Sequence, residues 1–148
     1  MPKESIKMTQ EELRDFLKTD SRLVLATLAP DTKAWADTVA YVFVDDRIYF
    51  RVSEHSLSLA NIRRDPRVAG AVESHPKGSE YYAIRGATCH GSAKEGSTAQ
   101  VDAALARIAD PVAPRDPRNG VVFSIGIEDQ LSFMFSKIKY RYDDRRSA

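Results

Sequence analysis

The chain has 148 residues, of which 43% are hydrophobic and 29% charged, and its formal net charge is +1. Length and composition predict one globular domain over residues 1–148 and exclude a disordered chain, while the near-neutral charge favours neither nucleic acid nor a membrane surface as a partner. No apolar run approaches the roughly 20 residues of a membrane span, the first residues lack the apolar core of a secretory signal, and the single cysteine, Cys89, excludes an internal disulfide, so we expect a cytoplasmic protein.

Capping and alternation signals predict the first elements of the chain. Thr9 and Glu12 have the spacing of a capping box, in which a hydroxyl and a carboxylate accept from free amides at a helix start, and they predict a helix at about 9–18. Short runs of apolar and β-branched residues, bounded by turn residues, then predict three strands. These strands cover residues 23–28, 35–43 and 48–52. Asp45-Asp46, between the last two, predicts a tight reversal.

The middle of the chain predicts a helix followed by strands. Ser56 is a suitable cap for a short helix, which Pro66 prevents from continuing past Asp65. The segments that follow are a strand over 68–73, a turn over 75–78 and a long strand over 81–94. Gly86 and Gly91 lie within the long strand and are expected to mark bulges or bends.

The last third of the chain predicts a helix, a loop and two strands. The helix begins at Ser97 or Thr98, and the segment 110–119, with its three prolines, is a loop. One face of the helix is apolar and consists of Val101, Ala104, Leu105 and Ile108. The two strands cover 121–128 and 131–142. Apolar residues change phase within the second strand, which predicts a bulge near Ser136.

These elements add up to a mainly β fold. Six or seven mostly antiparallel strands are expected, with helices at the ends and between strands. Most connections are too short for the crossovers that parallel strands need. The sequence therefore predicts an antiparallel β-barrel with peripheral helices, in which the barrel covers about residues 21–142.

Four segments together carry a family resemblance. They read RLVLATLAPD, DDRIYF, SLSLANIRRDPRV and YYAIRGATCHG. In order and spacing they resemble the pyridoxamine 5'-phosphate oxidase-like, FMN-binding split-barrel family over about residues 13–141. The resemblance implies a split β-barrel that forms a homodimer, with two FMN sites in the clefts between the subunits. Family members include oxidases, reductases and flavin-less relatives, so the fold alone does not fix the activity.

The resemblance also implies which positions contact the cofactor. These positions are Thr38, Val39, Ala40, Arg51, Val52, Leu57, Ser58 and Tyr81. Leu57-Ser58 match an Arg-Lys pair that holds the FMN phosphate in the family, and Asp37 falls near the place of another phosphate-facing Arg. A phosphate monoester carries nearly two negative charges, so these departures remove attraction and add a carboxylate. We hypothesise that Arg51 replaces the missing Lys as the phosphate cation; otherwise the cofactor is not FMN.

Other residues with chemical potential each have a structural interpretation as well. Cys89 and His90 are adjacent, and adjacent strand residues point to opposite faces, so no metal site is expected. Tyr81 is compatible with simple core packing, and Arg51 with an exposed surface charge. The only basic stripe consists of Lys137, Lys139 and Arg141. It is either an exposed strand face or a set that reaches an anionic ligand across the dimer cleft.

The sequence leaves more than one class of function open. The first is an FMN-dependent oxidoreductase that acts on an unknown small molecule, in which the flavin carries the hydride chemistry and no side chain is identified as catalytic. The second is a non-enzymatic dimer that binds flavin or another ligand weakly, or has an empty cleft. A deazaflavin-dependent reductase is a third interpretation that shares the fold. The cofactor therefore stays open among FMN, a deazaflavin or none.

Overall fold

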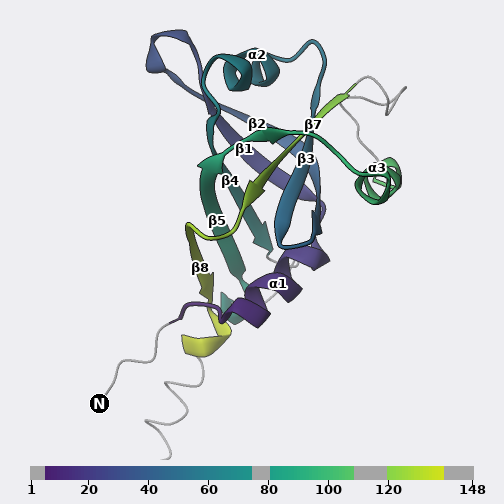
Figure 1. The fold of residues 1–148 in the computed structure, drawn as a ribbon. Coiled ribbons are helices and arrows are strands. Elements are labelled where there is room, and N and C mark those ends of the chain that lie inside the picture. The colour runs from purple at the N-terminus through teal and green to yellow at the C-terminus, as the bar shows by residue number, and fades with distance from the viewer. Residues whose placement is uncertain (1–5, 75–80, 109–119, 139–148) are drawn as a thin grey trace, which may run out of the picture.

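A computed structural model describes residues 6–74, 81–108 and 120–138 of the chain. Eight antiparallel strands form one sheet in the order β6-β7-β3-β2-β1-β4-β5-β8 (Figure 1). The strands are β1 (Arg22–Leu28), β2 (Ala34–Val44), β3 (Arg47–Ser53), β4 (Arg67–Ser74), β5 (Arg85–Ser92), β6 (Lys94–Glu95), β7 (Gly120–Gly126) and β8 (Gln130–Met134). The helices are α1 (Gln10–Thr19), α2 (Leu57–Arg64) and α3 (Ala99–Ala106), with 3-10 turns at Pro30–Thr32 and Tyr81–Ala83.

The sheet curls into a barrel because one long strand bends at Ala93. This residue alone separates β5 from β6, so β5 pairs with β4 while its continuation β6 pairs with β7. The Ala93 amide donates to the Pro66 carbonyl at 2.8 Å, which fixes the corner. The expectation of a split β-barrel is confirmed. The strand count is eight rather than six or seven, in part because the strand expected over 81–94 is divided here.

Aromatic side chains from three neighbouring strands fill the barrel. Tyr41 on β2 lies opposite Phe50 on β3, which lies opposite Phe123 on β7, so the three share one face of the sheet. The rings of Phe50 and Phe123 are 6.1 Å apart between centroids. All three side chains are buried. The alternation of burial along these strands therefore defines an inner face, toward the core, and an outer face.

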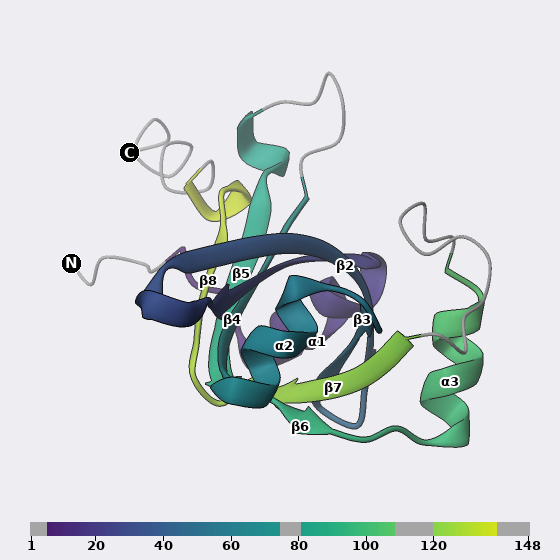
Figure 2. The same cartoon turned by 90° about the horizontal axis from the view of Figure 1, so that it is seen from above.

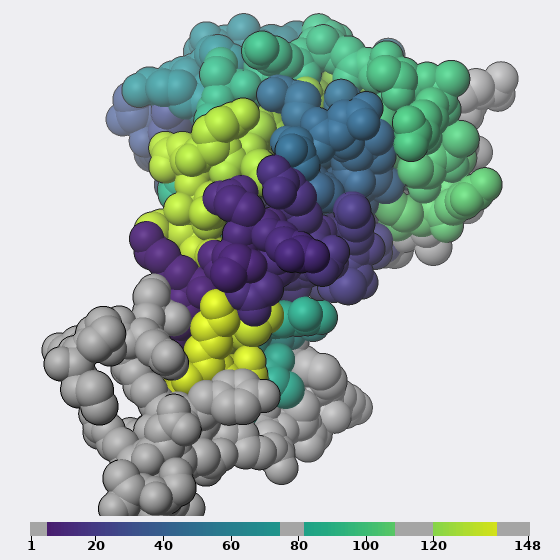
Figure 3. Space-filling model, turned by 60° about the horizontal axis from the view of Figure 1, so that its bottom comes forward, coloured from purple at the N-terminus to yellow at the C-terminus, as the bar shows by residue number. Residues whose placement is uncertain are grey.

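Helix α1 closes the end of the barrel that lies at the bottom of Figure 1, and Figure 3 shows it packed beside β8. The predicted capping box of Thr9 and Glu12 is confirmed, and Leu13, Phe16 and Leu17 are buried. Arg14 forms an ion pair with Asp46, with 2.9 Å between Nε and Oδ1. Asp46 belongs to the predicted reversal, where Asp45 and Asp46 have φ of 52° and 58°.

The last described segment corrects the expectation of a strand over 131–142. Strand β8 ends at Met134, Phe135 forms a turn and 136–138 are helical, so the bulge near Ser136 is wrong. In this turn the Lys137 ammonium donates to Glu12 Oε1 of α1 at 2.7 Å. Lys137 therefore lies in a helical turn and not on an exposed strand face, while Lys139 and Arg141 lie outside the described residues.

Two further expectations change along β5. Gly86 and Gly91 pair with β4 in unbroken register, so neither marks a bulge. Gly86 instead makes room for an aromatic ring, since a Cβ there would lie 2.7 Å from Cζ of Phe133. Tyr81–Ala83 is a 3-10 turn rather than the start of the strand. The predicted turn over 75–78 and the whole loop over 110–119 lie outside the described residues.

Helix α3 lies against the outer face of the barrel beside β2 (Figures 1 and 2). Thr98 caps it, as predicted, by accepting the Val101 amide at 3.2 Å. Val101 and Leu105 are buried, so the expected apolar face is used for packing. Within the three described ranges, no helix is long and apolar enough to cross a bilayer.

Replacing Tyr41 with Phe tests how α1 is held on the barrel. The Tyr41 hydroxyl is buried and donates to the Leu17 carbonyl at 2.8 Å. Its removal leaves that carbonyl without its partner, so the free energy of unfolding should fall by about 1–2 kcal/mol. Chemical denaturation measures this change. The matched control is Tyr49→Phe, a half-buried position, where a loss as large as that of Tyr41→Phe would contradict the assignment.

The capping carboxylate of Glu12 makes stability depend on pH. The Lys137 ammonium, followed by the Thr9 amide, lowers the pKa of Glu12 below its ordinary value of 4.5. A lowered folded pKa stabilises the protein above the unfolded pKa, and this contribution is lost as the pH falls through the folded pKa. Glu12→Gln should therefore unfold with a weaker pH dependence between about pH 6 and 3. Glu11→Gln, on the exposed side of α1, should retain the wild-type pH profile in the same denaturation series.

Candidate functional site

Helix α2 lies across the end of the barrel opposite α1, as seen from above in Figure 2. Ser56 caps its start, as predicted, because its Oγ accepts the Leu59 amide at 3.1 Å. The same hydroxyl donates to the Ser53 carbonyl at 2.8 Å and so fixes the loop that enters the helix. The helix ends at Asp65, before Pro66, because proline cannot continue the backbone hydrogen bonds. Both ends of α2 are therefore set by local sequence.

Two polar side chains of α2 point into the barrel end rather than to solvent. Ser58 is fully buried, and its Oγ donates to Oδ2 of Asp37 at 2.8 Å. One turn later, Nδ2 of the buried Asn61 donates to Oγ1 of Thr27 at 3.1 Å. Leu57, by contrast, is 59% exposed. These bonds pin the first turns of α2 to β1 and β2.

Asp37 is a half-buried carboxylate on the inner face of β2. Its register partner is Leu25, and it stands two residues from Val39, both of which lie in the core. Besides Ser58, the indole Nε1 of Trp35 donates to the same oxygen at 3.3 Å. No ion pair to Asp37 is present among the described residues. Neutral donors, rather than a cation, therefore hold the carboxylate.

Arg51 lies on the opposite, outer face. Its register partners are Ala40 on β2 and Val122 on β7, and only 6% of its surface is exposed. Gly120 makes this placement possible, since a Cβ there would collide with the aliphatic stem of Arg51. Beside Arg51 is a cavity of about 560 Å³ between the start of β7, the end of β6 and α3.

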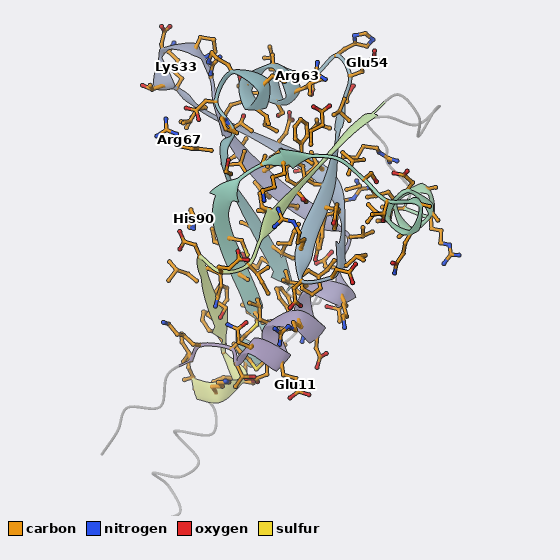
Figure 4. The ribbon with its side chains drawn as sticks, viewed as in Figure 1. Glu11, Lys33, Glu54, Arg63, Arg67 and His90 are labelled. Carbon is orange, nitrogen blue, oxygen red and sulfur yellow. The ribbon has the colours of Figure 1, made fainter. Side chains whose placement is uncertain are left out.

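The cavity contains charges of both signs. The carboxylates of Glu95 and Asp102 line it together with Arg51. Glu95 also forms an ion pair of 3.4 Å with Arg63, which reaches across from α2. Figure 4 shows Arg63 on α2, at the same end of the barrel as Lys33 and Glu54. A polar or anionic group that entered the cavity would therefore meet Arg51 as a buried cation.

The predicted cofactor positions fall into separate places. Thr38 is exposed on the outer face, and Ala40 is buried beside Arg51 on the same face. Val39 and Val52 belong to the core, so their side chains pack inward. Leu57 and Ser58 start α2, as described above. Tyr81 lies in a 3-10 turn, and its side chain is outside the described set.

An FMN phosphate does not fit the start of α2 in this chain. Leu57 is uncharged, the Ser58 hydroxyl is already bonded to Asp37, and the nearest acidic oxygen would face the phosphate. Arg51 does not stand beside Ser58, because alternation places it on the other face of the sheet from Asp37. The hypothesis that Arg51 replaces the missing Lys at this place is therefore not supported.

Several contributors to the site have little signal in the sequence. Gly120 follows a proline-rich segment and resembles a simple turn glycine, although it accommodates Arg51. Trp35 resembles a core aromatic, although it is 38% exposed and bonds to Asp37. The apolar face of α3 indicates from the sequence alone that this helix covers another element. That it packs against β2, on the outer face at Ala40, is known only from the structure.

The side chains of Cys89 and His90 lie apart in the structure and differ in exposure. Cys89 is buried, and burial raises the pKa of its thiol to about 11, so it is protonated at neutral pH. His90 is exposed on the opposite face of β5, as predicted, and its side chain lies on the outside of the barrel in Figure 4. The described ranges contain no cluster of three or more His, Cys, Asp or Glu residues that could hold a metal.

Comparison with known proteins identifies relatives of this fold. The family model described as pyridoxamine 5'-phosphate oxidase matches residues 9–129. No curated protein matches the chain. A conserved hypothetical protein from Mycobacterium tuberculosis is 23% identical with a TM-score of 0.70, over 94% of this chain and 93% of that one.

Two other similar solved structures are described as ligand-binding or ligand-storage proteins. A FAD-binding protein from Mesorhizobium loti is 19% identical with a TM-score of 0.70, over 85% of this chain and 94% of that one. The heme storage protein HutZ from Vibrio cholerae is 15% identical with a TM-score of 0.62, over 84% and 94% of the two chains. At these identities the likeness shows a shared fold.

Proposed function

Because the chain belongs to the pyridoxamine 5'-phosphate oxidase family, we propose that it is a flavin-dependent oxidoreductase that acts on a small molecule in the cytoplasm. The family assignment and the FAD-binding relative from Mesorhizobium loti support a flavin. A bound flavin supplies hydride or electron transfer at its ring, while the protein supplies binding, orientation and electrostatics. FMN is one candidate for the cofactor, and a deazaflavin is another.

The buried guanidinium of Arg51 is the observation that carries this proposal. Arg51 is buried and lines a cavity of about 560 Å³, so an electron-rich group that entered the cavity would meet its guanidinium at low local dielectric. The carbonyl edge of a flavin ring is such a group, and it becomes negative on reduction. Arg51 would then bind the ring and favour its reduced form.

A homodimer is the second part of the proposal, and the outer face of the sheet supports it. One row of residues crosses five strands on that face. In order, the row is Thr38, Val24, Ala71, Thr88 and Leu131. Val24 is 47% and Leu131 63% exposed. A flat face of small residues with two exposed aliphatic side chains suits a two-fold related copy of itself.

The dimer face and the proposed cofactor cleft adjoin one another. Thr38 ends the row just described, and two residues further along β2 is Ala40, the partner of Arg51. A second subunit on this row would therefore approach the strand position that pairs with Arg51.

A non-enzymatic ligand-binding dimer is the competing function. The pairing of Asp37 with Ser58 favours it, because it removes the phosphate grip that the family resemblance implies. The heme storage protein of Vibrio cholerae has the same fold and a storage role. The oxidoreductase is supported if the protein binds flavin and a nicotinamide or other donor reduces that flavin at a rate typical of enzyme turnover. A colourless protein that binds neither flavin nor deazaflavin supports the alternative.

Substitution of Arg51 tests whether its buried guanidinium binds the flavin. Arg51→Ala should weaken the binding of riboflavin and FMN alike by about tenfold or more, since a buried hydrogen-bonding cation is lost. Arg51→Lys retains the charge and should recover part of that loss. Fluorescence titration measures both affinities, and circular dichroism confirms the fold. Affinities within a factor of two of the wild type for Arg51→Ala would contradict the proposed role.

A lysine on the outer face tests the dimer. Leu131→Lys should convert a dimer into a monomer at micromolar concentration, because it places two charges in the isologous contact. Light scattering gives the mass directly. Ala103→Lys, at an exposed position of α3, is the matched control and should leave the mass unchanged. A wild-type protein of monomeric mass would contradict the dimer.

A further inference from the structure

The start of α2 is occupied by a negative charge that the chain itself supplies. The first amides of a helix and its dipole make such a place favourable for an anion. Here Asp37 lies under the first turn and bonds to the fully buried Ser58 at 2.8 Å. We propose that Asp37 is a specificity-determining residue that excludes a terminal phosphate from the first turn of α2.

The charges around Asp37 support exclusion of a dianion. Its two donors, Ser58 and Trp35, are neutral, so the carboxylate keeps its full charge. A phosphate monoester at the first turn of α2 would add almost two negative charges beside it. In a partly buried setting such repulsion is strong, because the local dielectric is lower than that of water.

The arginines of α2 do not offset this repulsion. Arg63 is paired with Glu95, and the guanidinium of Arg64 donates to the Leu28 carbonyl. Both lie in the last turn, where cations stabilise the helix terminus. The positive charge of α2 is therefore at the end away from Ser58.

The inference rests on the proposed flavin site, and two related flavins test it. Riboflavin and FMN share the ring and the ribityl chain and differ in the phosphate. Fluorescence titration of the full chain should show that FMN binds no more tightly than riboflavin. Asp37→Asn keeps an acceptor for Ser58 and Trp35 but removes the charge. It should shift the preference toward FMN by about tenfold.

Asp31→Asn is the matched control. It removes one carboxylate from the exposed turn before β2, at a positive φ of 70° that asparagine tolerates. This variant should leave the ratio of the two affinities within about a factor of two of the wild type, because exposed charges are screened.

The outcomes separate the two claims. Wild-type protein that binds FMN tenfold or more tightly than riboflavin would overturn the role of Asp37 and leave the flavin site intact. An unchanged ratio in folded Asp37→Asn would overturn it as well. If neither flavin binds, the proposed function fails, and this inference fails with it. If Asp37→Asn does not fold, the ratio of the FMN and riboflavin affinities of the wild-type protein still tests the inference.

Discussion

The corner at Ala93 is the constraint on which the rest of the structure depends. There a single strand stops pairing with β4 and begins to pair with β7, so an open sheet becomes a barrel with two ends. The hydrogen bond from the Ala93 amide to the Pro66 carbonyl joins this corner to the short link between α2 and β4. The position of α2 over one end of the barrel and the path of the chain into α3 are both set from this point.

The barrel then separates two chemical environments by strand alternation alone. On β2, Asp37 faces the inside of the barrel end and Ala40 faces the outside, three residues apart. The inner place contains a carboxylate held by neutral donors. The outer place contains the buried Arg51 beside a cavity. The buried cation is therefore at β3 and the carboxylate is at α2, which reverses the charges that the family resemblance implies at the start of α2.

Local signals predicted much of the fold. The capping box at Thr9, the reversal at Asp45-Asp46 and the helix between Ser56 and Asp65 involve contacts within a few residues, and all three are confirmed. The failures involve distant partners. After Met134 the chain contacts α1 through Lys137 and Glu12, and at the break of the long strand it contacts Pro66 and β7. No periodicity in the sequence contains that information.

The residue types of the candidate site could be predicted from the sequence, but the directions of their side chains could not. The sequence identified the missing Arg-Lys pair and the nearby Asp37, because both are comparisons of aligned positions. It could not show that Ser58 turns inward to meet Asp37, or that Gly120 allows Arg51 to lie under α3. Those facts depend on which face of a strand meets which helix, and register must be known before they can be stated.

The most direct test of the central claim is a crystal structure of the protein soaked with FMN. The account predicts that Ser58 still donates to Asp37, that the flavin ring lies beside Arg51 and that no phosphate oxygen lies within hydrogen-bond distance of Ser58 or of the first amides of α2. A phosphate bound at those amides, with Asp37 turned away, would contradict it.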